Sequence, residues 1–94
     1  MRISMTPDTM RVRAGEVRTQ GDNFQGVIAR MRAIIIELQA DWEGQASRAF
    51  HEQFERLQPA FNEMRQLIDN IAMQLDQSAN AVQQMDQEIA RKFG

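Results

Sequence analysis

Apolar residues recur every seven positions along two long stretches of the chain. In the first stretch, one series is Met10, Val17, Phe24, Met31 and Leu38, and the other is Ala14, Gly21, Ile28, Ile35 and Trp42. In the second stretch, the two series are Phe50, Leu57, Met64, Ile71, Ser78 and Met85, and Phe54, Phe61, Ile68, Leu75, Val82 and Ile89. Only Ser78 breaks the apolar pattern of this stretch. Paired series of this kind are the seam positions of heptads, so they predict two long packed helices.

Local signals indicate where these helices begin and end. Thr6 can cap a helix, and Pro7 suits the first helical position, where its missing N–H costs nothing. Gly44 can adopt the left-handed conformation that ends many helices, and only a tight turn fits between the two stretches. We predict one domain over residues 1–94, with helices at about 7–41 and 46–91 joined by a turn at about 42–45.

The predicted fold is all-α, an antiparallel helical hairpin. Pro59 lies on the outer face of the second helix, where we expect a kink rather than a break. The side chains expected to pack within the hairpin and between its copies are Phe24, Ile28, Met31, Ile34, Ile35, Leu38, Phe50, Phe54, Leu57, Phe61, Met64, Ile68, Ile71 and Leu75.

The two helices differ in length, and this difference predicts an assembly. Pairing them about a turn near residue 44 brings Met10 beside Ser78 and leaves about Val82 to Phe93 without a partner. That segment still carries large apolar side chains, and leaving each one in water forgoes about 1.5–3 kcal/mol. We therefore expect a dimer that forms a four-helix bundle, with each overhang near the turn of its partner.

Composition excludes several classes of protein. A formal net charge of -2 gives no electrostatic basis for binding nucleic acid. The chain has no cysteine, so disulfides and thiolate zinc sites are excluded. The N-terminal segment lacks the apolar core of a cleaved signal peptide, and no stretch is apolar enough to span a bilayer.

The sequence offers no basis for catalysis. It has one histidine, His51, and neither a glycine-rich phosphate loop nor a zinc-protease motif. We also expect no pocket in a simple hairpin. The prediction is a protein that is not an enzyme and needs no metal, cofactor or small-molecule substrate.

Two motifs resemble a known family. The turn contains Trp42-Glu43-Gly44, followed by Ala46 and Phe50 in the pattern W-x-G-x-A-x-x-x-F. Near the C-terminus, VQQMDQEIARKF places hydrophobic, acidic, hydrophobic and hydrophobic residues at Val82, Asp86, Ile89 and Phe93. With the chain length and the predicted hairpin, this resembles the WXG family of ESAT-like (Esx) proteins.

The resemblance implies a small substrate of the type VII secretion system of Gram-positive bacteria, able to assist the export of other substrates. Such proteins are exported folded, as homodimers or heterodimers with a paralogue, without a cleaved signal peptide. It further implies a composite export signal that is read by a membrane-bound ATPase. The signal residues would be Trp42 and Gly44 of one copy with Val82, Asp86, Ile89 and Phe93 of the other.

The chain departs from the family pattern at one position, and two other functions are also compatible with its sequence. Many members carry a tyrosine four residues before the acidic position, where this chain has Val82, so recognition through a phenol ring is in doubt. Trp42 also completes a heptad series, so packing alone can explain it. The chain could instead be a targeting chaperone that pairs with a larger effector or toxin. A membrane-active amphipathic protein ranks last, because no basic polar face is present.

Overall fold

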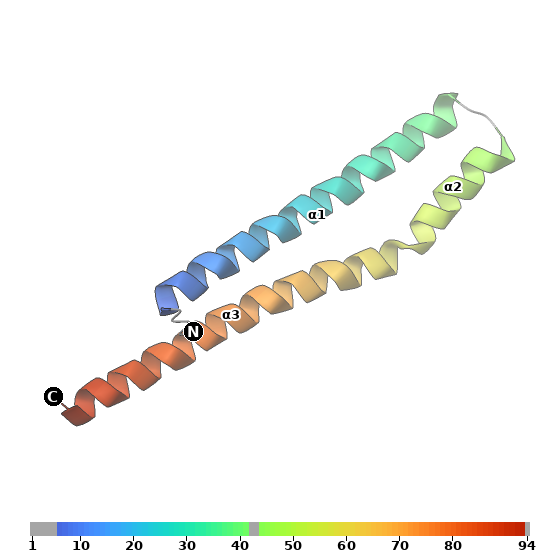
Figure 1. Ribbon diagram of the computed structural model, residues 1–94. Coiled ribbons are helices and arrows are strands. Elements are labelled where there is room, and N and C mark those ends of the chain that lie inside the picture. The colour runs from blue at the N-terminus through green and yellow to red at the C-terminus, as the bar shows by residue number, and fades with distance from the viewer. Residues whose placement is uncertain (1–5, 42–43, 94) are drawn as a thin grey trace, which may run out of the picture. The chain divides into compact units, whose positions relative to one another are not determined.

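The structure is a computed structural model that describes residues 6–41 and 44–93. Over these residues the chain forms α1 (Pro7–Asp41), α2 (Gln45–Arg56) and α3 (Gln58–Phe93) (Figure 1). The predicted all-α helical hairpin is confirmed. None of these helices is long and apolar enough to cross a membrane.

The described residues form two compact units. The terminal unit holds residues 6–20 and 68–93, and the turn unit holds residues 21–41 and 44–67. Each unit therefore pairs part of α1 with a later part of the chain. Contacts within both units connect earlier residues of α1 to later residues of its partner, which is the order expected of antiparallel helices.

Thr6 caps the N-terminus of α1. Its side-chain oxygen accepts a hydrogen bond of 3.2 Å from the Thr9 backbone N–H, and its carbonyl accepts one of 3.0 Å from Met10. Pro7 is the first helical residue. An N–H at this position would have no acceptor within the helix, so the missing N–H of proline costs no hydrogen bond. The sequence signals at this end of the chain therefore act as capping principles predict.

The second helical stretch is divided at Leu57. This residue has φ −84° and ψ −7°, and its N–H donates to the Phe54 carbonyl at 3.0 Å rather than continuing the regular pattern. The cause is Pro59, which follows two residues later, because it has no N–H to donate and its ring crowds the carbonyl four residues earlier. Two helices, α2 and α3, thus stand where one kinked helix was expected.

Small side chains form the core of the terminal unit. Ala14, Ala72 and Ala79 are fully buried, which lets α1 and α3 approach closely. At the edge of this core, Arg18 pairs with Asp76. The unit therefore combines a narrow apolar seam with a charged contact across the helices.

The pairing in the terminal unit extends further toward the C-terminus than the sequence suggested. Arg11 donates hydrogen bonds to Asn80, at 3.0 Å, and to Gln83. Val82 is accordingly half-buried, whereas each residue from Gln83 to Phe93 is exposed. The expected overhang therefore begins after Val82, because α1 reaches opposite Gln83.

Phe54 is the main anchor of the turn unit. Its side chain is 4% exposed, and its ring centroid lies 5.5 Å from that of Phe61. The Arg32 guanidinium carbon lies 5.8 Å from the same centroid, within the range of a cation–π interaction. These contacts hold α2 and the start of α3 against α1.

Candidate functional site

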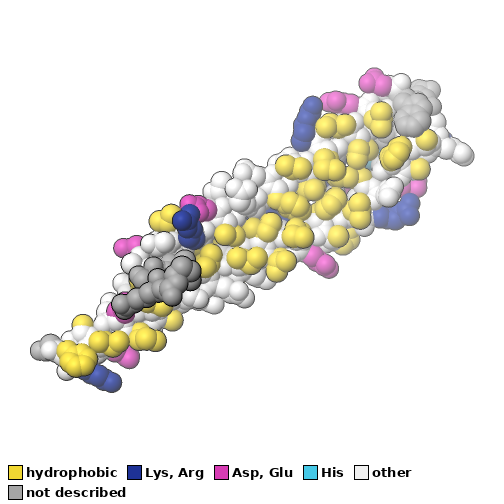
Figure 2. All heavy atoms as spheres, viewed as in Figure 1, with side chains coloured by type: hydrophobic (Ala, Val, Ile, Leu, Met, Phe, Trp, Pro, Cys, Tyr) yellow, Lys and Arg dark blue, Asp and Glu magenta, His cyan; other side chains and the backbone are white. Residues whose placement is uncertain are grey.

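One side of the turn unit exposes large apolar side chains. We call Met31, Ile34 and Leu38 of α1, with Leu57 and Met64, the apolar flank. Their exposed fractions lie between 37% and 47%. Figure 2 shows apolar side chains gathered on one face of this unit, with charged groups along its edges. Exposed apolar surface that gathers on one face is typical of interaction sites, so the apolar flank is a candidate one.

Some residues of the heptad series are buried in the interior, and others are exposed on the apolar flank. Phe54 is buried, and Phe24, Ile28, Ile35 and Phe61 are half-buried within the turn unit. In the terminal unit, Ile68 and Leu75 are half-buried and Ile71 is exposed. Phe50 is 51% exposed. Along α2 and α3, one series therefore faces inward and the other faces outward. On α1 the separation is incomplete, because Phe24 is half-buried whereas Met31 and Leu38 of the same series are exposed.

Charged pairs cross the opposite side of the turn unit. Arg65 donates a hydrogen bond of 2.9 Å to Asp22, and Arg32 Nε lies 3.3 Å from a Glu55 carboxylate oxygen. His51 Nε2 lies 3.9 Å from the same oxygen. Exposed ion pairs contribute only about 0–1 kcal/mol each, so these pairs orient the helices more than they stabilise them.

Arg13 shows the electrostatics of the exposed helix surface. It donates hydrogen bonds to both carboxylate oxygens of Glu16, at 3.1 and 2.8 Å. The hydrogen bond, and then the attraction between the charges, raises the pKa of Arg13 above its ordinary value. Because an arginine is already fully charged at neutral pH, this pair gives the protein no pH dependence there.

Gly44 lies at the start of α2 rather than at the end of α1. It has φ +152° and ψ 175°, so the prediction that it ends the first helix in the left-handed helical conformation was wrong. Its carbonyl accepts hydrogen bonds from the Ser47 hydroxyl, at 3.0 Å, and from the Arg48 N–H, at 3.4 Å. These bonds fix the first turn of α2. Trp42, the other expected signal residue of the turn, lies outside the described residues.

The predicted signal residues near the C-terminus share one face of α3 in the terminal unit. Val82 is half-buried, whereas Asp86, Ile89 and Phe93 are exposed, the last two by 50% and 88%. Their spacing of four, three and four residues places them on one stripe of a helix. Three of the four side chains are thus available to a partner.

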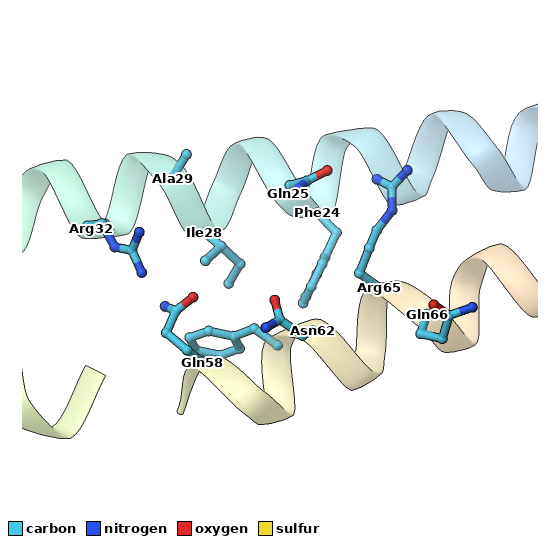
Figure 3. Close-up of a pocket in the computed structure, with 10 residues that line it drawn as sticks. Phe24, Gln25, Ile28, Ala29, Arg32, Gln58, Asn62, Arg65 and Gln66 are labelled. Carbon is cyan, nitrogen blue, oxygen red and sulfur yellow. The ribbon is translucent and has the colours of Figure 1, made fainter. Parts of the chain in front are cut away.

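A pocket of about 270 Å³ opens in the turn unit, which corrects the expectation that a hairpin has none. It is lined by Phe24, Gln25, Ile28, Ala29, Arg32, Gln58, Phe61, Asn62, Arg65 and Gln66 (Figure 3). Sequence reasoning expected no pocket and missed this site. The available signal was the seven-residue spacing of Gln25 to Arg32 and of Gln58 to Arg65, beside the apolar seams.

The described residues offer no obvious metal site. Among residues 6–41 and 44–93, no group of three His, Asp or Glu side chains is placed to hold an ion. The features left for function are therefore the apolar flank, the turn, the exposed end of α3 and the pocket.

Comparison with known proteins places these features in a family. The pattern of WXG100, described as proteins of 100 residues with WXG, matches residues 2–87. The chain is 34% identical to protein YukE of Bacillus subtilis (strain 168), over 97% of this chain and 94% of that protein. It is also 34% identical to type VII secretion system extracellular protein A of Staphylococcus aureus (strain USA300), over 98% of this chain and 95% of that one.

Solved structures agree with this assignment. The Geobacillus thermodenitrificans EsxA crystal structure matches with a TM-score of 0.81 and 34% identity, covering 96% of this chain and 97% of that one. The secreted protein EsxB of Bacillus anthracis, with 22% identity and a TM-score of 0.80, covers 92% of this chain and 98% of that one and shares the fold. On the family pattern, the sequence identities and the fold, the chain belongs to the WXG100 family.

Proposed function

We propose that this protein is a small type VII secretion substrate that acts through dimerisation and contact rather than catalysis. The proposal rests on its membership of the WXG100 family and on its 34% sequence identity to a type VII secretion system extracellular protein. The protein is made in the cytoplasm and exported without a cleaved signal peptide. It also assists the export of other substrates.

The apolar flank supports a homodimer. Five large side chains on one side of the turn unit remain more than a third exposed, and no large side chain among the described residues is fully buried. Burying each of the five against a second copy contributes up to about 1.5–3 kcal/mol. A second copy presents the same flank, so the surface can complement itself in a symmetric four-helix bundle.

The exposed end of α3 supports a composite export signal. In an antiparallel dimer, the stripe of Asp86, Ile89 and Phe93 from one copy lies near the turn of the other, where Trp42 and Gly44 stand. The membrane-bound ATPase of the secretion system reads both parts together. Val82 contributes to this stripe from its half-buried position.

Secretion of alanine variants tests the signal. Asp86→Ala and Ile89→Ala should each lower the exported fraction, measured by immunoblot of culture medium and cells from a host with the cognate secretion system. Gln87→Ala, an exposed change in the same turn of α3, is the matched control and should be exported normally. Equal export of all three variants would contradict the proposed signal.

The alternative is a targeting chaperone that pairs with a larger effector or toxin. Light scattering on the purified chain separates the two functions. A homodimer has twice the 10.9 kDa chain mass. A chain that stays monomeric alone, and pairs only when an effector is coexpressed, supports the chaperone instead.

A further inference from the structure

The pocket of the turn unit has a charged group at each end. Figure 3 shows Arg32 of α1 at one end and Arg65 of α3 at the other, with Ile28 and Gln58 between them. Each guanidinium also has a carboxylate partner, Glu55 for the first and Asp22 for the second. The aromatic and aliphatic linings are Phe24, Ile28 and Phe61.

Two buried nitrogen atoms in this pocket lack a hydrogen-bond acceptor among the described residues. One is the side-chain amide nitrogen of Gln58, Nε2. The other is Arg32 Nε, whose 3.3 Å contact with Glu55 is an ion pair without the geometry of a hydrogen bond. A buried donor left without an acceptor costs about 1–3 kcal/mol, so native proteins rarely keep one. An occupant that carries acceptor oxygens would supply both atoms.

We propose that this pocket binds a carboxylate group, presented either by a small organic acid or by an acidic side chain of a peptide. A carboxylate has two acceptor oxygens and no donor, which matches the two donors without acceptors. A cation would face two guanidiniums, and a neutral donor would leave both nitrogens unsatisfied. The apolar lining accommodates the short alkyl portion that carries the carboxylate.

The size of the pocket and the surrounding charges favour a weak ligand of this kind. About 270 Å³ exceeds the ~150 Å³ of a cavity that binds benzene and lies just below the range of drug-sized ligand sites, so it suits a small molecule or a single side chain. Glu55 and Asp22 already neutralise much of the charge of the two arginines, so a multiply charged anion gains little. A single carboxylate with an apolar tail uses both the donors and the lining.

The pocket and the apolar flank occupy different sides of α1. At about 100° per residue, the stripe of Gln25, Ala29 and Arg32 points away from the stripe of Met31, Ile34 and Leu38. A second copy bound to the apolar flank therefore leaves the pocket open. The proposed carboxylate site shares no residue with the apolar flank or with the predicted export signal.

Titration by nuclear magnetic resonance tests this site on the full chain. We expect sodium butyrate, added at constant ionic strength, to shift the Gln58 side-chain amide and Arg32 Nε–H signals along saturating curves. Butyramide, which has the same shape without the charge, should shift them far less. An N-acetylated and C-amidated glutamate distinguishes a peptide side chain from a free acid: saturation by both compounds indicates a general carboxylate site.

A variant pair identifies the donor. Gln58→Ala should weaken butyrate binding about tenfold, as expected on losing one hydrogen bond to a charged group. Gln53→Ala, an exposed glutamine of α2 outside the pocket, should leave the affinity unchanged. Shifts that do not saturate in the unaltered protein, or that butyramide reproduces equally, would overturn the proposal and leave ordered water as the occupant.

Discussion

Arg65 of α3 donates a hydrogen bond of 2.9 Å to Asp22 of α1, across 43 positions of the sequence. In this pair α1 supplies the carboxylate, whereas in the pair of Arg32 and Glu55 it supplies the guanidinium. We expect the Asp22→Ala and Arg65→Ala cycle to give a coupling of at most about 1 kcal/mol, because the Asp22 side chain is 73% exposed. Urea unfolding of both single variants and the double variant measures it. A coupling of several kcal/mol would show that this pair stabilises the fold rather than orienting it.

Two neighbouring isoleucines test the apolar flank. Ile34→Glu should dissociate the dimer, because it puts a charge into the proposed interface, where desolvation is costly. Ile36→Glu is the matched control, since Ile36 is similarly exposed, at 51% against 47%, but points to another side of α1. Sedimentation velocity over a range of protein concentrations gives the dissociation constants. If the two changes weaken the dimer equally, the apolar flank is not the interface.

Two phenylalanines test the anchor of the turn unit. Phe54→Ala should lower the free energy of unfolding by about 3–5 kcal/mol, because it leaves a cavity beside Phe61 and Arg32. Phe93→Ala changes a side chain that is 88% exposed and should have little effect. Thermal unfolding followed by circular dichroism measures both. The interpretation of Phe54 as an anchor fails if the two variants melt together.

Two glycines test the backbone of the turn. Gly44→Ala should destabilise the protein by about 1–3 kcal/mol, because φ +152° is a region that other residues rarely occupy. Gly15→Ala should instead stabilise it by about 1 kcal/mol, since alanine favours a helix interior. An added Cβ would meet no other atom within 4 Å at either position. A difference in stability between the two variants would therefore reflect the backbone conformation and not a steric clash. Chemical unfolding of both variants at matched concentrations provides the comparison.

The sequence determined the kind of element and where the first helix begins. Thr6 and Pro7 specified the start of α1, and the heptad series specified the stripes that pack, because capping and side-chain periodicity are local properties of the chain. Family membership was also readable, since the Trp-x-Gly turn and the C-terminal pattern are linear motifs. These features need no knowledge of which residues meet across the hairpin.

Only the tertiary structure decided which series faces inward and what lies between the helices. Phe54 is buried while Leu57 is exposed, although both are seam positions, because the choice depends on how α1 and its partner are rotated. The extent of pairing through Arg11 and Gln83 was likewise set by packing. So was the pocket, since Gln58 and Arg32 become neighbours only when distant parts of the chain come together, and no local rule specifies that distance.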